Sequence, residues 1–316
     1  MKALVWLGGR EISYEEVPDP APGDGEVVLD VELAGICGSD LHAFRGHGGP
    51  RVPPLVLGHE VVGRYDGDPY TVYPLVACGE CARCLAGEDN LCPAWKLIGV
   101  HRPGVFAEQV VVPQASLVRV PAGLDPRRAA LTEPLACCVG ALAPEALGEG
   151  STLVVFGCGP IGLLSVYVGA RAGARVIAVD PVAGRLETAV ALGASGTVSD
   201  AAELDPASAD VVLDAAGFET TWRAALEVVK TGGSIVMVGL GQADAPFPMA
   251  LLVRRSITLR GQFAYSRAHF ATALDILAEG DLDLRWLSSA SLGEGAEAFS
   301  NLVDRPAEFS KVLLAP

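Results

Sequence analysis

Hydrophobic and polar residues alternate along the first third of the chain. In the stretch GEVVLDVELAG (25–35), apolar side chains occupy every second position and acidic side chains lie between them. A period of two places the apolar side chains on one face of an extended strand, so this stretch predicts a half-buried β-strand. Shorter strands are predicted at 61–66, 70–76 and 107–112. Residues 1–120 are therefore expected to be mostly β-structure.

The pattern changes after about residue 145, where short apolar runs alternate with amphipathic stretches of helical length. This alternation is typical of a parallel sheet with right-handed crossovers. Six strands are predicted at 151–157, 174–180, 196–198, 209–217, 233–240 and 256–261, with helices from 158 to about 172 and at 183–194, 218–229 and 266–279. The predicted fold class is α/β: a β domain followed by a doubly wound Rossmann domain with a six-stranded parallel sheet.

The change of pattern also predicts the domain boundaries. Residues 1–143 form the β domain, 144–285 form the Rossmann domain, and 286–316 are expected to return to the first domain. The stretch Ser151–Ala170 has no charged residue and is long enough to span a bilayer. Its glycines and Pro160 instead favour a buried strand–helix unit.

Composition argues against several classes of protein. Half of the residues are hydrophobic and 19% are charged, as in a globular chain. The net charge is −15 and no cluster of Lys and Arg is present, so nucleic acid is not expected as a partner. The first residues lack the charged and apolar regions of a signal peptide, so a cytoplasmic protein without a membrane partner is expected.

Four cysteines lie in the stretch CGECARCLAGEDNLC (78–92), at the spacing C-x2-C-x2-C-x7-C. Disulfides are disfavoured in a cytoplasmic protein, and the short rings between the first three thiols would strain them. Four thiolates would fill a tetrahedral zinc shell and leave no position for a substrate. We predict a lobe with a structural zinc ion, and a redox dithiol is the alternative. The predicted ligands are Cys78, Cys81, Cys84 and Cys92.

The stretch VVFGCGPIG (154–162) contains a G-x-G-x-x-G motif, which follows a predicted strand and opens a predicted helix. Asp180 ends the next predicted strand, as the dinucleotide fingerprint requires. Its carboxylate can bind both ribose hydroxyls and would repel a 2′-phosphate, so we predict NAD as the cofactor in preference to NADP. The predicted cofactor residues are Gly157, Gly159, Pro160, Ile161, Gly162, Asp180, Arg185, Val238 and Gly239.

Three further segments, GICGSDLHAF (35–44), LGHEVVG (57–63) and LTEPLACC (131–138), carry side chains that bind zinc in other proteins. A site with three protein ligands and one open position is typical of catalytic zinc. Spacing alone leaves other readings open, because the thiol and the imidazole suit a core and a glutamate suits the surface. The candidate ligands are Cys37, His59, Glu60 and Glu133.

The order of these motifs resembles that of the zinc-dependent medium-chain dehydrogenases, the family of alcohol, sorbitol, threonine and aminocyclitol dehydrogenases. The resemblance covers nearly the whole chain. It rests on Cys37-Gly38-Ser39-Asp40-Leu41-His42, Gly58-His59-Glu60, the four-cysteine lobe, Glu133-Pro134-Leu135 and the glycine motif at Gly157–Gly162.

The resemblance implies a GroES-like catalytic domain, a Rossmann domain and two zinc ions per chain. It implies that Cys37, His59 and Glu60 bind the catalytic zinc, and that Glu133 either completes the shell or binds a water molecule on the ion. Ser39 would accept the proton of the substrate hydroxyl, and His42 would pass it onward through the nicotinamide ribose. Relatives are homodimers or homotetramers, so a homo-oligomer is expected.

Two departures from the family pattern concern the substrate. The segment between Gly63 and Cys78 is shorter than the one relatives usually carry, and Ala264 in GQFAYS (261–266) replaces an arginine of the polyol enzymes. The predicted function is transfer of hydride between NAD and a secondary alcohol or its ketone, with a polyol, cyclitol or aminocyclitol as substrate. A lyase or isomerase that recycles tightly bound NAD is the alternative, and a protein that only senses NAD(H) is a third.

The remaining candidates have ordinary structural readings. His47 is expected in an exposed loop, His101 in a turn and His269 on a helix surface. Core thiols are expected at Cys137, Cys138 and Cys158, and Asp214 is expected at a strand end.

Overall fold

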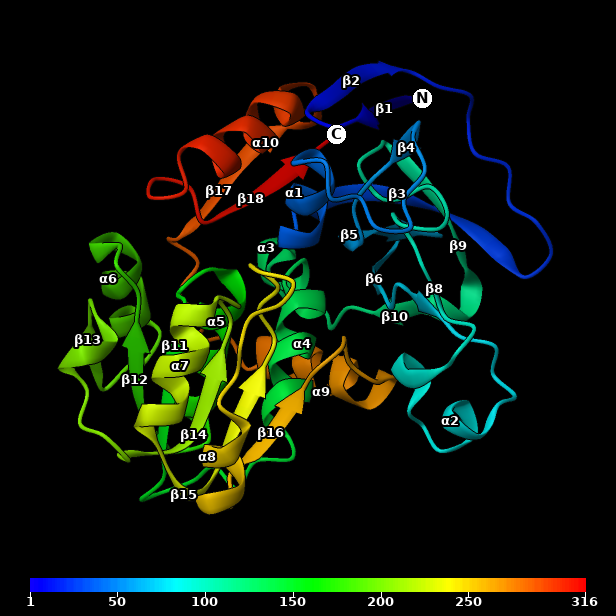
Figure 1. The fold of residues 1–316 in the computed structure, drawn as a ribbon. Coiled ribbons are helices and arrows are strands. Elements are labelled where there is room, and N and C mark those ends of the chain that lie inside the picture. The colour runs from blue at the N-terminus through cyan, green and yellow to red at the C-terminus, as the bar shows by residue number, and fades with distance from the viewer. The chain divides into compact units, whose positions relative to one another are not determined.

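The computed structural model describes all residues from Met1 to Pro316. The chain divides into two compact units (Figure 1). The first unit contains Met1–Pro134 and Ser266–Pro316, and the second contains Leu135–Tyr265. No helix has both the length and the apolar character needed to cross a membrane.

The first unit is built around a seven-stranded sheet whose central strand is β3 (Glu26–Gly35). Val27, Leu29 and Val31 of β3 are buried as the alternation predicts, but Leu33 is only partly buried because the pairing register shifts between Val31 and Leu33. β3 pairs antiparallel with β5, β9 and β18, so three segments that are distant in sequence meet on it. The order is β10 (Leu117–Arg119), β6 (Asp68–Val72), β5 (Glu60–Tyr65), β3, β18 (Lys311–Ala315) and β17 (Leu287–Ser291), with β9 (Gln109–Pro113) paired to β3.

The end of the chain belongs to the core of this unit. Helix α10 (Gly295–Asp304) lies against β17 and β18 (Figure 1). Its Phe299 is fully buried, with its ring centroid 5.5 Å from that of Phe44 and 5.8 Å from that of Phe106. The C-terminal segment therefore completes the β unit.

The first unit also contains a second sheet, made of β2 (Glu11–Glu16), β1 (Lys2–Gly8) and β4 (Leu55–Val56). The other helices of the unit include α1 (Gly38–Phe44), α2 (Ala82–Leu85), α3 (Pro126–Ala129) and α9 (Arg267–Ala278).

The second unit contains the predicted six-stranded parallel sheet, in the order β13-β12-β11-β14-β15-β16. The strand order reverses between β11 and β14, which is the switch point where doubly wound sheets bind ligands. The strands are β11 (Thr152–Phe156), β12 (Arg175–Val179), β13 (Gly196–Val198), β14 (Ala209–Asp214), β15 (Val229–Met237) and β16 (Thr258–Gly261), and the helices are α5 (Pro160–Arg171), α6 (Ala183–Ala191), α7 (Glu219–Val228) and α8 (Met249–Arg254).

The unit boundaries differ from the predicted ones at 143 and 285. The first boundary falls inside α4 (Thr132–Leu142), and the second precedes α9, which belongs to the β unit. The reason for the second difference is packing: Phe270 of α9 meets Tyr73 edge to face at 5.5 Å, and Arg267 lies 4.4 Å from the Tyr73 ring centroid. Periodicity predicted this helix, but it does not say which core the helix covers.

Candidate active site

The four lobe cysteines converge. They lie between β7 (Leu75–Val76) and β8 (Lys96–Leu97), which pair antiparallel and close the loop. Sulfur–sulfur distances are 3.5 Å for Cys81–Cys84, 3.6 Å for Cys78–Cys92 and 3.8 Å for Cys78–Cys84. Four sulfurs around a tetrahedral zinc, with Zn–S bonds of about 2.3 Å, are separated by about 3.8 Å.

The lobe therefore fits a zinc ion. All four sulfurs lie within 4.8 Å of one another, and no other group of potential ligands in the chain meets that limit. Backbone N–H groups of Glu80 and Cys81 lower the pKa of Cys78 to about 6, which favours the thiolate that zinc binds. The sulfurs are too far apart to be disulfide-bonded.

A second group of ligand types lies at the edge of the seven-stranded sheet. Antiparallel pairing places Gly35 of β3 opposite Glu60 of β5. Cys37 follows β3 and His59 precedes β5, so this register brings the thiol to the imidazole, and the two side chains hydrogen-bond. Glu133, in the first turn of α4, also raises the pKa of this imidazole through its charge.

The environment of His59 is strongly anionic. Burial by itself lowers the pKa of His59, but Asp40, Cys37 and Glu133 raise it to about 10. An imidazole beside two buried carboxylates and a thiol makes a site that favours a cation, and sulfur, imidazole and carboxylate are zinc ligands. Cys37, His59 and Glu133 thus lie in one neighbourhood, although their ligand atoms do not all come within 4.8 Å of one another as those of the lobe do, and their chemistry fits zinc.

Glu60 makes a different contact. Its Oε2 accepts a hydrogen bond from Lys311 Nζ, which also donates to the Ile36 carbonyl oxygen at 2.9 Å. Both charged side chains are 1% exposed, and Glu60 Oε1 is buried without a hydrogen-bond partner. A Cβ on Gly35 would lie 2.0 Å from Glu60 Oε2, so only glycine fits there. A zinc ion would give the orphaned oxygen a partner, although Glu60 pairs with Lys311 in this structure.

Asp40 and Arg51 contact the candidate site residues, although neither of them was predicted to have a role there. Asp40 is fully buried, and its Oδ2 accepts the N–H of Cys37 at 3.1 Å. Its Oδ1 lies 3.8 Å from His59 Nδ1 and 3.4 Å from Arg51 Nη2. Asp40 stood in the quoted motif, but no pattern indicated Arg51, whose contact depends on how its loop folds.

The two predicted proton-transfer residues both lie on α1. Ser39 is partly buried, and its Oγ accepts a hydrogen bond from Arg51 at 3.1 Å. Burial, with the charges of Arg45, His47 and Arg51, lowers the pKa of His42. His42 is therefore mostly neutral near pH 7 and can accept a proton.

The glycine motif adopts the geometry that a dinucleotide needs. Gly157 has a positive φ of 85°, and a Cβ on Gly162 would lie 1.7 Å from the Gly157 carbonyl oxygen. A Cβ on Gly159 would meet nothing within 4 Å, which leaves space for a phosphate at the start of α5. The predicted Pro160 and Ile161 form the first turn of this helix.

Asp180 follows β12 and holds the loop in place. Its carboxylate accepts the N–H of Cys158 at 2.8 Å and that of Val182 at 2.9 Å, and Arg185 Nη1 lies at 3.4 Å. Across the switch point, the N–H groups of Val238 and Gly239 both donate to the Asp214 carbonyl oxygen at 2.9 Å. The predicted cofactor residues thus lie at the carboxyl ends of β11, β12 and β15 in the second unit.

The other candidates have structural roles. His101 Nδ1 accepts the N–H of Leu97 at 3.1 Å, and His269 Nδ1 accepts that of Ser266 at 3.3 Å. Asp214 is fully buried, and its carboxylate binds the N–H groups after β14, which ends that strand earlier than predicted. Burial raises the pKa of Cys158 to about 12, so it is a core thiol. His47 is exposed, Cys138 is buried and Cys137 is partly buried.

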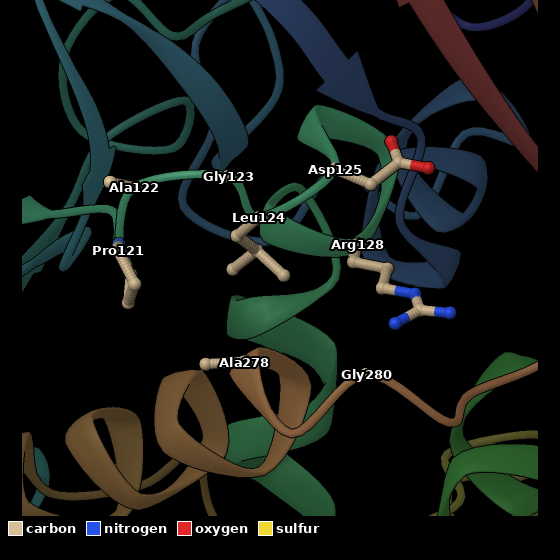
Figure 2. A pocket seen from close by; sticks show the side chains of 8 residues that line it. All are labelled: Pro121, Ala122, Gly123, Leu124, Asp125, Arg128, Ala278 and Gly280. Atoms are coloured by element: carbon tan, nitrogen blue, oxygen red, sulfur yellow. The ribbon is translucent and has the colours of Figure 1, made fainter.

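A cavity of about 380 Å³ lies elsewhere in the first unit (Figure 2). It is formed by the loop Pro121–Asp125, Arg128, Ala278 and Gly280, and Figure 2 shows the Arg128 and Leu124 side chains at its wall. None of the predicted zinc ligands lines this cavity. This cavity is therefore not the candidate site.

Residues 23–122 match the family model of the alcohol dehydrogenase GroES-like domain, and 160–279 match that of zinc-binding dehydrogenases. Sorbitol dehydrogenase from Halalkalibacterium halodurans is 34% identical over an alignment 346 positions long, which covers 100% of this chain and 99% of that protein. The chain belongs to the zinc-dependent medium-chain dehydrogenases.

Two further relatives of this dehydrogenase are informative. L-galactonate-5-dehydrogenase from Escherichia coli is 32% identical over 303 residues, covering 89% of this chain and 88% of that protein. A zinc-binding dehydrogenase from Sinorhizobium meliloti, solved with NADP bound, is 34% identical with a TM-score of 0.90, covering 100% and 99% of the two chains. The GroES-like and Rossmann architecture is confirmed, and the chain is a zinc-dependent alcohol oxidoreductase. The lyase or isomerase alternative has no support among these relatives.

Proposed function

We propose that this dehydrogenase transfers hydride between NAD and a secondary alcohol of a polyol, cyclitol or related sugar derivative. The observation that carries the proposal is the group of Cys37, His59 and Glu133, with Ser39 two residues after Cys37, in a chain that also has the dinucleotide loop. The sorbitol and L-galactonate enzymes among its relatives support a polyhydroxylated substrate. We further propose a cytoplasmic homo-oligomer with two zinc ions per chain.

Each residue has a role in this proposal. Cys37 and His59, with Glu133 or Glu60, would hold the catalytic zinc. Bound zinc would act as a Lewis acid on the alcohol, and bound NAD would accept hydride. Ser39 would accept the proton of the substrate hydroxyl, and the neutral His42 would take it onward through the nicotinamide ribose.

A panel of substrates tests the proposal. Polyols, cyclitols, aminocyclitols, amino-alcohols and aldonates are incubated with zinc-loaded enzyme and NAD, and the absorbance of reduced nicotinamide is followed. Net accumulation of NADH with a secondary alcohol, lost when a chelator removes zinc, supports a dehydrogenase. Conversion of a substrate without net NADH would instead favour the lyase or isomerase, and no conversion of any secondary alcohol would contradict the proposal.

The zinc content is the first quantitative expectation. Metal analysis of the purified protein should give two zinc ions per chain. Cys84→Ser should reduce this to one, because three thiolates hold the lobe ion less tightly than four. It should also lower the thermal stability, because zinc binding contributes directly to the folding of such lobes. A wild-type content of one zinc per chain would mean that one of the two sites is assigned wrongly.

Cofactor preference depends on Asp180. Asp180→Ala should weaken NAD binding by about 10- to 100-fold, the effect of losing hydrogen bonds to a charged group. NADP binding should change much less, because removing the Asp180 carboxylate also removes its repulsion of the 2′-phosphate of NADP. Asp180→Asn is the control, since the amide keeps an acceptor for the Cys158 N–H that Asp180 binds at 2.8 Å. The dissociation constants for NAD and NADP are measured by calorimetry or fluorescence. An equal loss of affinity for both cofactors would contradict the preference for NAD.

A further inference from the structure

A buried guanidinium lies beside the proton-transfer residue. Arg51 belongs to the loop between α1 and β4, and only 7% of its side chain is exposed. Its Nη2 reaches back to the first turn of α1, donating to Ser39 Oγ at 3.1 Å and approaching Asp40 Oδ1 at 3.4 Å. Removing a guanidinium from water is costly unless its interactions compensate, so this contact is a specific feature of the fold.

We propose that Arg51 is a positioning residue that orients the Ser39 hydroxyl for proton transfer, an inference that rests on the proposed function. A hydroxyl has one donor and two acceptor positions. The Arg51 N–H occupies one acceptor position of Ser39. The second acceptor position is left for the substrate hydroxyl, and the Ser39 O–H is left to donate to the next group of the chain.

The proton transfer through Ser39 is balanced. The O–H bond of the substrate breaks as a new O–H bond forms at Ser39 Oγ. The original Ser39 proton leaves toward the nicotinamide ribose and His42, so Ser39 begins and ends neutral. Because the arginine stays bound to one acceptor position throughout, it restrains the hydroxyl from turning its proton back toward the substrate.

Asp40 holds the guanidinium in place. Its Oδ2 is bound to the Cys37 N–H at 3.1 Å, and its Oδ1 lies between Arg51 Nη2 and His59 Nδ1. The carboxylate is fully buried, so it needs a cation nearby. Arg51 therefore connects the residue that receives the proton to the carboxylate that faces the zinc-binding imidazole.

Direct binding of a substrate carboxylate is the competing role for Arg51. The structure favours positioning, because Arg51 Nη2 is already engaged by both Ser39 and Asp40. The two roles separate kinetically. Loss of a positioning residue lowers kcat, whereas loss of a substrate-binding residue raises KM.

The experiment compares Arg51→Gln, Arg51→Lys and Arg45→Gln in the zinc-loaded, full-length enzyme, with the alcohol that the substrate panel identifies. Arg51→Gln should lower kcat by about 10- to 100-fold with KM changed by less than about threefold, the loss expected for a misplaced proton acceptor. Arg51→Lys should recover part of the loss, because it keeps a cationic donor. Arg45→Gln is the matched comparison: exposed Arg45 also contributes to lowering the pKa of His42 but does not bind Ser39, so kcat should fall much less than in Arg51→Gln.

A double-mutant cycle decides whether Arg51 acts through Ser39. In a Ser39→Ala background, Arg51→Gln should change kcat by less than about threefold, because coupled residues are not additive. The same loss in both backgrounds, an equal loss in Arg45→Gln, or a rise in KM with unchanged kcat would overturn the assignment. A wild-type enzyme that oxidises no secondary alcohol would instead overturn the proposed function, and with it the proton transfer assigned to Ser39.

Discussion

Replacing Cys37 by serine should abolish alcohol oxidation while leaving the fold and the lobe zinc intact. A hydroxyl is a poor zinc ligand beside a thiolate, so the catalytic ion should be lost or displaced. We expect kcat to fall by roughly a thousandfold, the upper range for removing one preorganised electrostatic contributor. Cys37 is only partly buried, so the fold should tolerate the change.

Three measurements separate this result from simple unfolding. Steady-state kinetics give the loss of turnover, metal analysis should fall from two zinc ions to one, and thermal unfolding should stay close to that of the wild type. Cys137→Ser is the control, since Cys137 is a partly buried thiol that belongs to neither proposed zinc site. If Cys37→Ser unfolds the protein instead, the structural and catalytic sites have been exchanged in this account.

The largest expected loss of stability follows from the buried pair of Glu60 and Lys311. Both side chains are 1% exposed. Lys311→Met removes the cation and leaves a buried carboxylate, which typically costs about 3–5 kcal/mol. Denaturant unfolding of the metal-free protein should show this loss. The double variant Glu60→Gln/Lys311→Met should recover most of it, because no uncompensated charge is left in the core.

Zinc should change the result if Glu60 is one of its ligands. Bound zinc offers the carboxylate a second cation, so the cost of Lys311→Met should be smaller in the zinc-loaded protein than in the metal-free protein. An equal cost in both forms would indicate that Glu133, and not Glu60, completes the site. A Lys311→Met variant as stable as the wild type in the metal-free form would contradict the reading of this pair as a buried ion pair.

Most of the fold was predictable because its signals are local. The alternation at 25–35 gave β3, and the short apolar runs after 145 gave all six strands of the parallel sheet. The glycine motif was predictable for the same reason, since Gly157 and Gly162 occupy positions that a Cβ would strain or block. The boundaries of the two units were not predictable, because α9 has an ordinary amphipathic pattern and its partner Tyr73 is distant in sequence.

The contacts that complete the candidate site are long-range. Lys311 meets Glu60 only because β18 pairs with β3, which places Leu313 opposite Gly35. Arg51 meets Ser39 because a glycine-containing loop folds back onto α1. Neither contact produces a periodic pattern of residues in the sequence. Ligand types were therefore recognisable from residue chemistry and motif order, whereas the partners that orient them required the fold.

The most direct test of this account is anomalous diffraction at the zinc absorption edge from crystals of the purified enzyme. We expect two peaks per chain: one inside the lobe formed by Cys78, Cys81, Cys84 and Cys92, and one bound by Cys37 and His59 with a coordination position open to solvent or substrate. A missing second peak, or an ion there whose shell is closed by protein atoms, would contradict it.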